Sequence, residues 1–241
     1  MFSYIWHTFF FDPIYNGLVF FVDVIPGGDV GLSIIAITIV VKLVLFPLSI
    51  RAAKTQRAMK EIEPKLKELQ EKHKSDREAL ARATMALYKE SGINPFSSIF
   101  LLLLQLPIIF ALYLSVLRGG GVPFPDINVD LLYSFVPVPE MVNMIFLGFV
   151  DITAKSLPLA LLAGAAQFVH SHMATPKLAP KKEGVVDLKD DFMRSMNLNM
   201  RYVLPVIIAI AAYTLSAAVA LYFTISGLMA ILQELMIRKH R

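Results

Sequence analysis

A single lysine near the middle of a long apolar segment constrains this chain more than any other feature. Residues 32–50 (LSIIAITIVVKLVLFPLSI) carry no charge except that of Lys42. A helix of this length, rising about 1.5 Å per residue, matches the roughly 30 Å hydrocarbon core of a bilayer. A cation at that depth costs at least about 2.5–3.5 kcal/mol. We therefore expect a membrane-spanning helix in which Lys42 faces a water-filled cavity and not lipid.

Snorkelling of the side chain is the alternative explanation of Lys42. In that case the four-carbon stem would carry the ammonium group to the lipid headgroups. The charged region begins nine residues later, at Arg51, so the nitrogen would have to cover about 13 Å. A lysine stem alone cannot reach that far, which favours a functional role for the charge.

The composition indicates an integral membrane protein. Hydrophobic residues make up 56% of the 241 residues, and the mean hydropathy is +0.61. The sequence has no cysteine, which excludes disulfides, thiolate metal sites and a cysteine nucleophile. Segment 1–28 lacks the basic start of a signal peptide, and Asp12, Pro13 and Asp23 interrupt its apolar stretch. Its aromatic residues predict an N-terminal helix that lies in the membrane interface.

Five transmembrane helices are predicted, at residues 29–50, 96–117, 156–173, 202–216 and 217–237. The last two form one apolar run that is too long for a single crossing, so a tight hairpin is expected near Ser216. The remaining segments are a cytosolic helical hairpin at 51–95, an extracytoplasmic loop at 118–155, a cytosolic loop at 174–201 and a short basic tail at 238–241.

The basic residues predict the orientation in the membrane. Residues 51–90 contain eleven Lys or Arg, residues 171–201 contain six and residues 238–241 contain three, together 20 of the 23 in the chain. With five spans all of them lie on one side, which the positive-inside rule assigns to the cytosol. The N-terminus is then outside and the C-terminus cytosolic. Because no organelle transit peptide is apparent, a bacterial plasma (inner) membrane is expected.

The segment 51–95 has the pattern of two amphipathic helices. An apolar stripe at helical spacing runs from Met59 to Leu69, and Ser75-Asp76-Arg77-Glu78 is a capping-box pattern that begins a second helix. The hairpin either connects two spans or also serves as a docking element. Seven acidic residues lie among its eleven basic ones, which argues against nucleic-acid binding.

Four segments carry a resemblance to a known family. They are ITIVVKLVLFPL (37–48), ALYKESGINPF (86–96), QLPIIFALY (105–113) and LYFTISGLMAILQELMI (221–237), with a weaker echo in FLGFVDIT (146–153). In this order and spacing they resemble the YidC/Oxa/Alb family of membrane protein insertases. The resemblance implies an all-α membrane protein whose five transmembrane helices enclose a hydrophilic groove, open to the cytosol and to lipid.

The resemblance also implies residues of that groove. Lys42 stands where the family has an intramembrane arginine, so the positive charge is kept but the planar bidentate fork is lost. Thr38, one helical turn earlier, matches a position implicated in substrate contact. The corresponding site in the last span is Tyr222-Phe223, where Phe223 replaces an aromatic residue that usually carries a hydroxyl.

The third predicted span supplies a further candidate. Gln167, His170 and Ser171 lie at i, i+3 and i+4 and share one helix face. Polar groups at membrane depth face protein or water, so Gln167 either lines the groove or packs between helices. For His170 and Ser171, near the predicted cytosolic end, an ordinary interfacial position is favoured.

The predicted function is that of a membrane protein insertase or chaperone. It would move short polar tails of nascent membrane proteins across the membrane and release their apolar segments into lipid. The expected partners are nascent membrane proteins and membrane lipids, with the ribosome and the secretion channel as further candidates and no direct nucleic-acid partner. We expect no cofactor, no metal and no enzymatic activity, since nucleotide-binding, metalloprotease and serine-hydrolase motifs are missing.

A small transporter or channel that uses Lys42 is the alternative function. Such a protein normally needs an intramembrane carboxylate as a partner for the cation. The acids in or beside the predicted spans, Asp29, Asp151 and Glu234, all lie near span ends. A chaperone that assists folding without inserting its clients also remains open.

Overall fold

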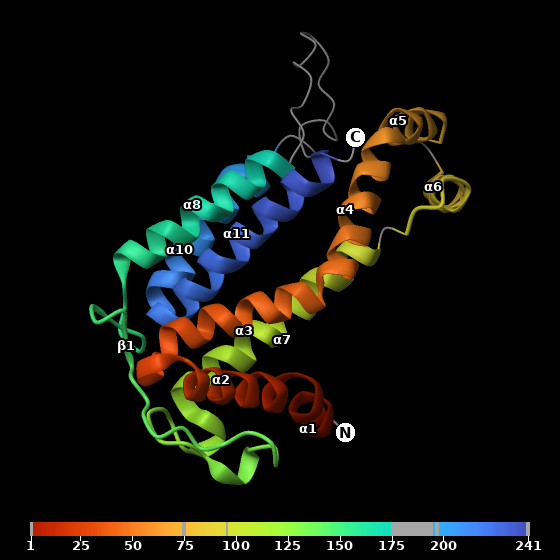
Figure 1. Ribbon diagram of the computed structural model, residues 1–241. Helices are drawn as coiled ribbons and strands as arrows, with labels where there is room; N and C mark the ends of the chain where they lie inside the picture. Colours follow the sequence, from red (N-terminus) through yellow and green to blue (C-terminus); the bar gives the residue numbers. More distant parts are fainter. Residues whose placement is uncertain (1, 74–75, 95, 175–194, 196–197, 240–241) are drawn as a thin grey trace. The chain divides into compact units, whose positions relative to one another are not determined.

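The computed structural model shows a mostly helical chain (Figure 1). The described residues are 2–73, 76–94, 96–174, 195 and 198–239. Ser75 of the expected capping pattern, most of the loop expected at 174–201 and the end of the basic tail lie outside them. The chain divides into two compact units, residues 1–42 with 107–241 and residues 43–106. The helical content agrees with the predicted all-α class.

The first unit begins with a helical segment made of α1 (Phe2–Trp6), the π-helical turn η1 (His7–Phe11) and α2 (Asp12–Val24). One face of α2 is buried, and Tyr15, Leu18 and Val19 are fully enclosed on it. The chain then turns through η2 (Pro26–Gly28), where Gly27 has a φ of 80° that residues with a side chain rarely adopt. This turn separates α2 from α3 (Val30–Val44).

The first unit also contains a bundle of α8 (Leu157–Ala174), α10 (Leu204–Leu215), which follows the turn η5 (Asn199–Val203), and α11 (Ala217–Lys239). Helix α8 packs against both α10 and α11 (Figure 1). A Cβ atom added at Gly164 would lie 2.8 Å from Ala209, and one added at Gly227 would lie 2.8 Å from Ala166. Small residues at such positions let helix backbones approach closely in a membrane.

Some of the helices are long and apolar enough to cross a membrane. Within the described residues, Leu103–Gly121 and Ala217–Ile237 qualify by themselves. A third span results when α3 and the start of the next helix, Phe46–Thr55, are counted together across the break at Leu45. The apolar helix Asn199–Leu215 is shorter. Length and composition thus support two or three spans, and the five-span topology stays a prediction.

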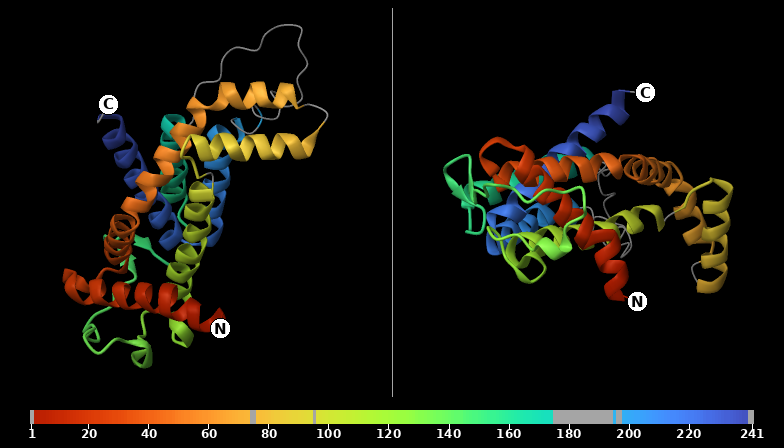
Figure 2. Two further views of the ribbon diagram at one scale, coloured as in Figure 1. Left: turned by 90° about the vertical axis from the view of Figure 1, so that its right-hand side faces the viewer. Right: turned by 60° about the horizontal axis from the view of Figure 1, so that its bottom comes forward.

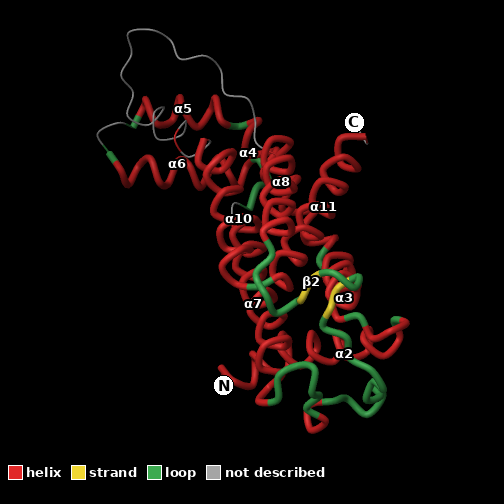
Figure 3. Tube along the Cα trace, turned by 90° about the vertical axis from the view of Figure 1, so that its left-hand side faces the viewer, coloured by secondary structure: helices red, strands yellow, loops and turns green. Residues whose placement is uncertain are grey.

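The loop at 118–155, which follows α7 (Phe96–Arg118), contains the turns η3 (Gly119–Gly121) and η4 (Val129–Leu131) and the strands β1 (Ile145–Phe146) and β2 (Val150–Asp151). The two strands pair antiparallel to form a short hairpin (Figure 3). The loop and α2 lie side by side (Figure 2), joined by hydrogen bonds from Asn16 to Leu131 and from Tyr133 to Asn16.

The second unit contains α4 (Phe46–Glu61), α5 (Glu63–Lys72) and α6 (Arg77–Glu90). Helices α4 and α5 meet at Ile62, and Pro64 lies in the first turn of α5, where its missing N–H is tolerated. Asp76 caps α6 by accepting hydrogen bonds from the backbone N–H groups of Glu78 and Ala79. The unit has its own small apolar core, formed by Ile62, Leu87 and Ile93 and surrounded by Ala58, Met59, Leu66, Leu69 and Tyr88.

Candidate functional site

Lys42 lies in the last turn of α3 and is half-buried. Its charge and that of Glu234 on α11 both act on the imidazole of His170 on α8. We call Lys42, His170 and Glu234 the charged trio. Helices α3 and α11 thus place a cation and a carboxylate within electrostatic range of the His170 ring on α8.

The charged trio has a defined chemical capacity. An ammonium group is a three-fold hydrogen-bond donor, a carboxylate accepts, and a neutral imidazole does both. Charges interact more strongly where water is scarce than in bulk solvent. Such a set can bind an incoming carboxylate or pass a proton, whereas the described residues contain no group of three potential metal ligands.

Thr38 and Tyr222 are both buried, each with only 1% of its surface exposed. The Thr38 hydroxyl donates to the carbonyl of Ile34 in its own helix at 2.6 Å. The Tyr222 hydroxyl faces Ser226, one turn further along α11, yet neither oxygen has a hydrogen bond of good geometry within the described residues. A ligand could reach either side chain only if the surrounding helices moved apart.

Phe223 and Gln167 are half-buried. The Phe223 ring packs edge-on against Tyr222, with ring centroids 5.7 Å apart. The Gln167 amide donates to the hydroxyl of Ser171, one turn along α8, at 3.1 Å. The backbone of Gln167 also lies close to Gly227, so this part of α8 packs directly on α11.

The five residues expected in the groove lie on three helices, α3, α8 and α11, and their common site stays a prediction. Tyr222 precedes Glu234 by twelve residues on the same helix, which corresponds to about 18 Å. Glu234 therefore lies well away from Tyr222 along α11. The sequence does not reveal that His170 is within electrostatic range of Lys42 and Glu234, because a linear pattern does not show which helix faces are apposed.

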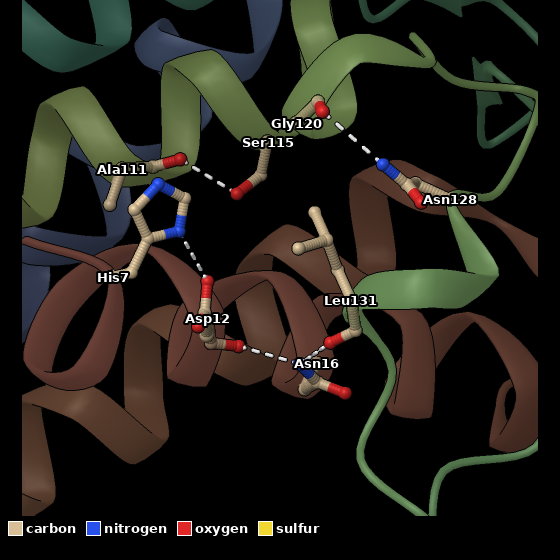
Figure 4. Close-up of polar contacts among 8 residues, drawn as sticks. All are labelled: His7, Asp12, Asn16, Ala111, Ser115, Gly120, Asn128 and Leu131. Atoms are coloured by element: carbon tan, nitrogen blue, oxygen red, sulfur yellow. Dashed lines mark hydrogen bonds and ion pairs between the residues drawn. The ribbon is translucent and has the colours of Figure 1, made fainter. Parts of the chain in front are cut away.

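A second polar cluster joins α2 to the loop at 118–155 (Figure 4). Asn16 is only 2% exposed. Its amide nitrogen donates to the carbonyls of Asp12 and Leu131 at 2.9 and 2.8 Å, and its amide oxygen accepts from the backbone N–H of Tyr133 at 2.6 Å. The three bonds use both sides of the amide, so this side chain holds the loop against the helix.

Aromatic hydroxyls complete this cluster. The Tyr15 hydroxyl accepts a 2.8 Å hydrogen bond from the backbone N–H of Asn128, and burial raises the pKa of Tyr15 above its ordinary value. The pKa of Tyr133 is also raised, mainly by burial and further by the negative charge of Asp12. His7 lies 2.8 Å from that Asp12 carboxylate (Figure 4).

One buried carboxylate, Asp29, connects the start of α3 to the β1–β2 hairpin. Its Oδ1 accepts from the N–H of Leu32 at 3.0 Å, which is the hydrogen bond of a helix N-cap. Its Oδ2 accepts from the N–H of Leu147 at 2.8 Å. Asp29 is 7% exposed. The side chain therefore serves as a helix cap and as a support for the hairpin at once.

The segment after the hairpin supports the start of α11. The N–H groups of Ala217 and Ala218 donate to the carbonyls of Ala154 and Ile152 at 2.8 and 3.0 Å. The first four backbone N–H groups of a helix have no acceptor within the helix, and these two bonds supply acceptors for two of them. Nearby, the Asp151 carboxylate accepts from the hydroxyl and N–H of Thr153, and these bonds lower the pKa of Asp151 below its ordinary value.

Comparison with known proteins identifies the family. The model of the family described as "60Kd inner membrane protein" matches residues 20–241. The chain belongs to this family. The resemblance to YidC/Oxa/Alb proteins expected from the sequence is thereby confirmed.

Bacterial relatives of this 60Kd inner membrane protein family are similar over nearly the whole chain. The membrane protein insertase YidC of Fusobacterium nucleatum is 30% identical over 213 residues, which is 88% of this chain and 87% of the relative. The YidC of Alkalihalophilus pseudofirmus is 30% identical over 236 residues, 95% of this chain and 80% of the relative. The YidC of Helicobacter pylori is also 30% identical, but the match spans only 33% of that longer protein. With its apolar helices, the family member described here is a bacterial membrane protein.

Proposed function

We propose that this protein is a membrane protein insertase that also acts as a chaperone for its clients. The observation that carries the proposal is a match to the insertase family over residues 20–241, shared with relatives that are named membrane protein insertases. The clients are nascent membrane proteins. The protein moves their short polar tails across the bilayer and releases their apolar segments into lipid.

A groove bounded by five transmembrane helices is the proposed path. The N-terminus lies outside and the C-terminus in the cytosol, so that most basic residues face the cytosol. A hydrated groove that reaches into the membrane shortens the apolar barrier of about 30 Å that a polar tail must cross. Burial of the client's apolar segment in lipid supplies the free energy, and the membrane potential helps to move an acidic tail outward.

Lys42 is proposed to attract acidic residues of the incoming tail. Its half-buried position strengthens a Coulomb interaction relative to bulk water. Glu234 brings a negative charge into the same neighbourhood, so a client carboxylate competes with an internal one. Phe223 and Gln167 are accessible enough to contact the client, whereas Thr38 and Tyr222 do so only after the helices part.

The α5–α6 hairpin is proposed to meet the client in the cytosol before it enters the groove. The apolar core of the second unit is formed by residues of that unit alone, which makes the hairpin a stable platform. Ribosomes and the secretion channel are the proposed further partners on this side and within the membrane.

Insertion by the purified protein in liposomes tests the proposal. A single-span client with an acidic outer tail is added, and protease protection of that tail is measured against empty liposomes. We expect protection with the wild type and about a tenfold loss of rate with Lys42→Glu, because that change replaces attraction by repulsion. Arg118→Glu, an equal charge reversal at an exposed site on α7, is the matched control. Wild-type protein that is folded but gives no protection would contradict the insertase function.

A transporter of protons or small ions is the second candidate function, and the charged trio favours it. A membrane carboxylate, a histidine and a lysine within electrostatic range are the groups of which proton relays are made. A pH-sensitive dye inside the same liposomes separates the two functions. Proton flux that disappears in Glu234→Gln, with no client protection, would support transport in place of insertion.

A further inference from the structure

The β1–β2 hairpin carries large apolar side chains that are not used in the core. Ile145, Leu147 and Phe149 are 40%, 53% and 86% exposed. We call these three side chains the apolar tip. The ten residues from Met141 to Val150 include no charged side chain. Exposed clusters of large apolar residues indicate a surface that another apolar phase covers.

The leucine in this tip has no local structural reason. Leu147 has a φ of 50°, and Gly148 follows with a φ of 79°. The left-handed region suits glycine or asparagine, whereas a leucine there is strained. Leu147 is neither a favoured turn residue nor a buried one, so neither turn geometry nor core packing accounts for a leucine at this position.

The tip is held on a fixed support. Asp29 accepts the hydrogen bond from the N–H of Leu147, and the N–H of Ile152 donates to the carbonyl of Met144 at 3.0 Å. The Phe146 ring fills the space at Gly31, where an added Cβ atom would lie 2.3 Å from it. The hairpin is therefore attached to the start of α3, and through Ile152 to the start of α11.

The backbone N–H groups of the tip are paired within the protein. The N–H of Ile145 donates to the Asn143 side chain, and the N–H of Leu147 donates to the Asp29 carboxylate. The N–H groups of Gly148 and Phe149 donate to the carbonyls of Ile145 and Phe146. Phe146 and Val150 are partners in the β-ladder. Moving a backbone segment from water into an apolar phase costs free energy for every N–H group that has no hydrogen-bond partner. A loop with paired donors and apolar side chains avoids that cost.

Neighbouring side chains indicate that the covering phase is lipid. The hairpin precedes α8 directly, and the first turns of α8 expose Leu157, Leu161 and Leu162. At the same end of the bundle, the Lys155 ammonium lies 5.8 Å from the centre of the Tyr213 ring. Tyrosine and lysine at the ends of membrane helices are typical of the headgroup level.

We propose that the apolar tip inserts into the boundary between headgroups and acyl chains of the bilayer and anchors the loop at 118–155 to the membrane surface. The lipid is recognised as an apolar interface and not through a specific headgroup, since the tip has no charge. The proposal requires only that the protein spans a membrane, so it stands or falls independently of the insertase function.

Site-directed spin labelling tests the anchor, because the sequence contains no native cysteine. A nitroxide is attached at Phe149→Cys in phosphatidylcholine vesicles, with Ile145→Cys as a second position. Glu140→Cys, an exposed acidic position of the same loop, is the control. The labels' collision rates with oxygen, which concentrates in lipid, and with a water-soluble nickel chelate are measured.

The anchor predicts a several-fold higher oxygen-to-nickel ratio at positions 149 and 145 than at position 140. Equal ratios, with strong nickel collisions at all three positions, would show a tip in water and overturn the proposal. Low collision rates with both reagents, together with spin–spin broadening between labels, would show a second copy of the chain on the tip and would also overturn it. Because Phe149 is so exposed, its replacement does not disturb the fold.

Discussion

Two polar regions of this protein are built in opposite ways. Asn16 and Asp29, in and beside the N-terminal helices, are buried and bond mainly to backbone groups. Lys42 and Glu234 are charged side chains from two different helices whose charges both act on His170 of a third helix. The first arrangement fixes the positions of chain segments, whereas the second keeps charge available for an interaction with something else.

The difference separates residues that hold structure from residues that do chemistry. A backbone group that bonds to a buried side-chain amide loses its hydrogen-bond partner when that amide is removed. The free energy of unfolding is therefore expected to fall. A side chain that interacts with other charged side chains can interact with a charge on a client in their place. Removing such a side chain is therefore expected to change which clients are preferred. Mutations in the two regions are therefore expected to change different observables.

Asn16→Leu should have the largest effect on stability. The change removes three hydrogen bonds, including those that hold the Leu131 carbonyl and the Tyr133 N–H against α2. We expect a loss of about 3 kcal/mol or more in the free energy of unfolding. Thermal unfolding in detergent and limited proteolysis of the loop measure it. Asn128→Ala is the control: it removes two exposed 3.2 Å bonds, one to the Gly120 carbonyl and one from the N–H of Asp130, and should cost much less stability.

Asp29→Ala should have the next largest effect. It removes the cap of α3 and the support of the hairpin together, with an expected loss of about 2 kcal/mol. In Asp29→Asn the side-chain oxygen can keep one of the two bonds, so the loss should be smaller. If both variants unfolded like the wild type, the carboxylate would not be a structural link and the contrast with the charged trio would fail.

Glu234→Gln should leave stability nearly unchanged and alter client preference. Without the internal carboxylate, Lys42 should interact more strongly with acidic tails. We expect the ratio of the insertion rates of an acidic and a neutral client to be about two- to three-fold higher in the variant than in the wild type. Paired insertion assays with the two tails measure the ratio. An unchanged ratio would mean that Glu234 does not compete with the client.

The smallest expected effect is a loss of hairpin order in acid. Because the folded pKa of Asp151 is below its ordinary value of 3.8, its contribution to stability is present above that pH and is lost as the pH falls through the lowered pKa. The carboxylate is exposed, so the change is small. The mobility of a spin label at position 149 should rise between pH 5 and about pH 3. In Thr153→Val, which removes the hydroxyl donor, that rise should shrink.

Local patterns predicted part of this molecule. Helices, the approximate start of α6 and the family were accessible from sequence because each depends on residues close together in the chain or on whole motifs. The position of Lys42 in an apolar helix was equally visible. These features require no knowledge of which helices pack together.

The features that were missed depend on long-range packing. Asn16 bonds to residues that follow it by 115 and 117 positions, so a lone asparagine in an aromatic segment gave no signal of its role. The apposition of His170 and Glu234 with Lys42 depends on the rotation of three helices about their axes. The burial of Thr38 and Tyr222 has the same origin.

The two hydrogen bonds from Ala217 and Ala218 to the preceding loop tie the first turn of α11 to that loop. A stiff rod held at one end pivots there, and its displacement grows along its length. Glu234 lies seventeen residues beyond Ala217, a lever of about 26 Å. A tilt of about 5° would then move Glu234 by roughly 2 Å while its first turn hardly shifts. A tilt of α11 about its loop end would therefore change the spacing between Glu234 and His170 far more than any contact near Ala217.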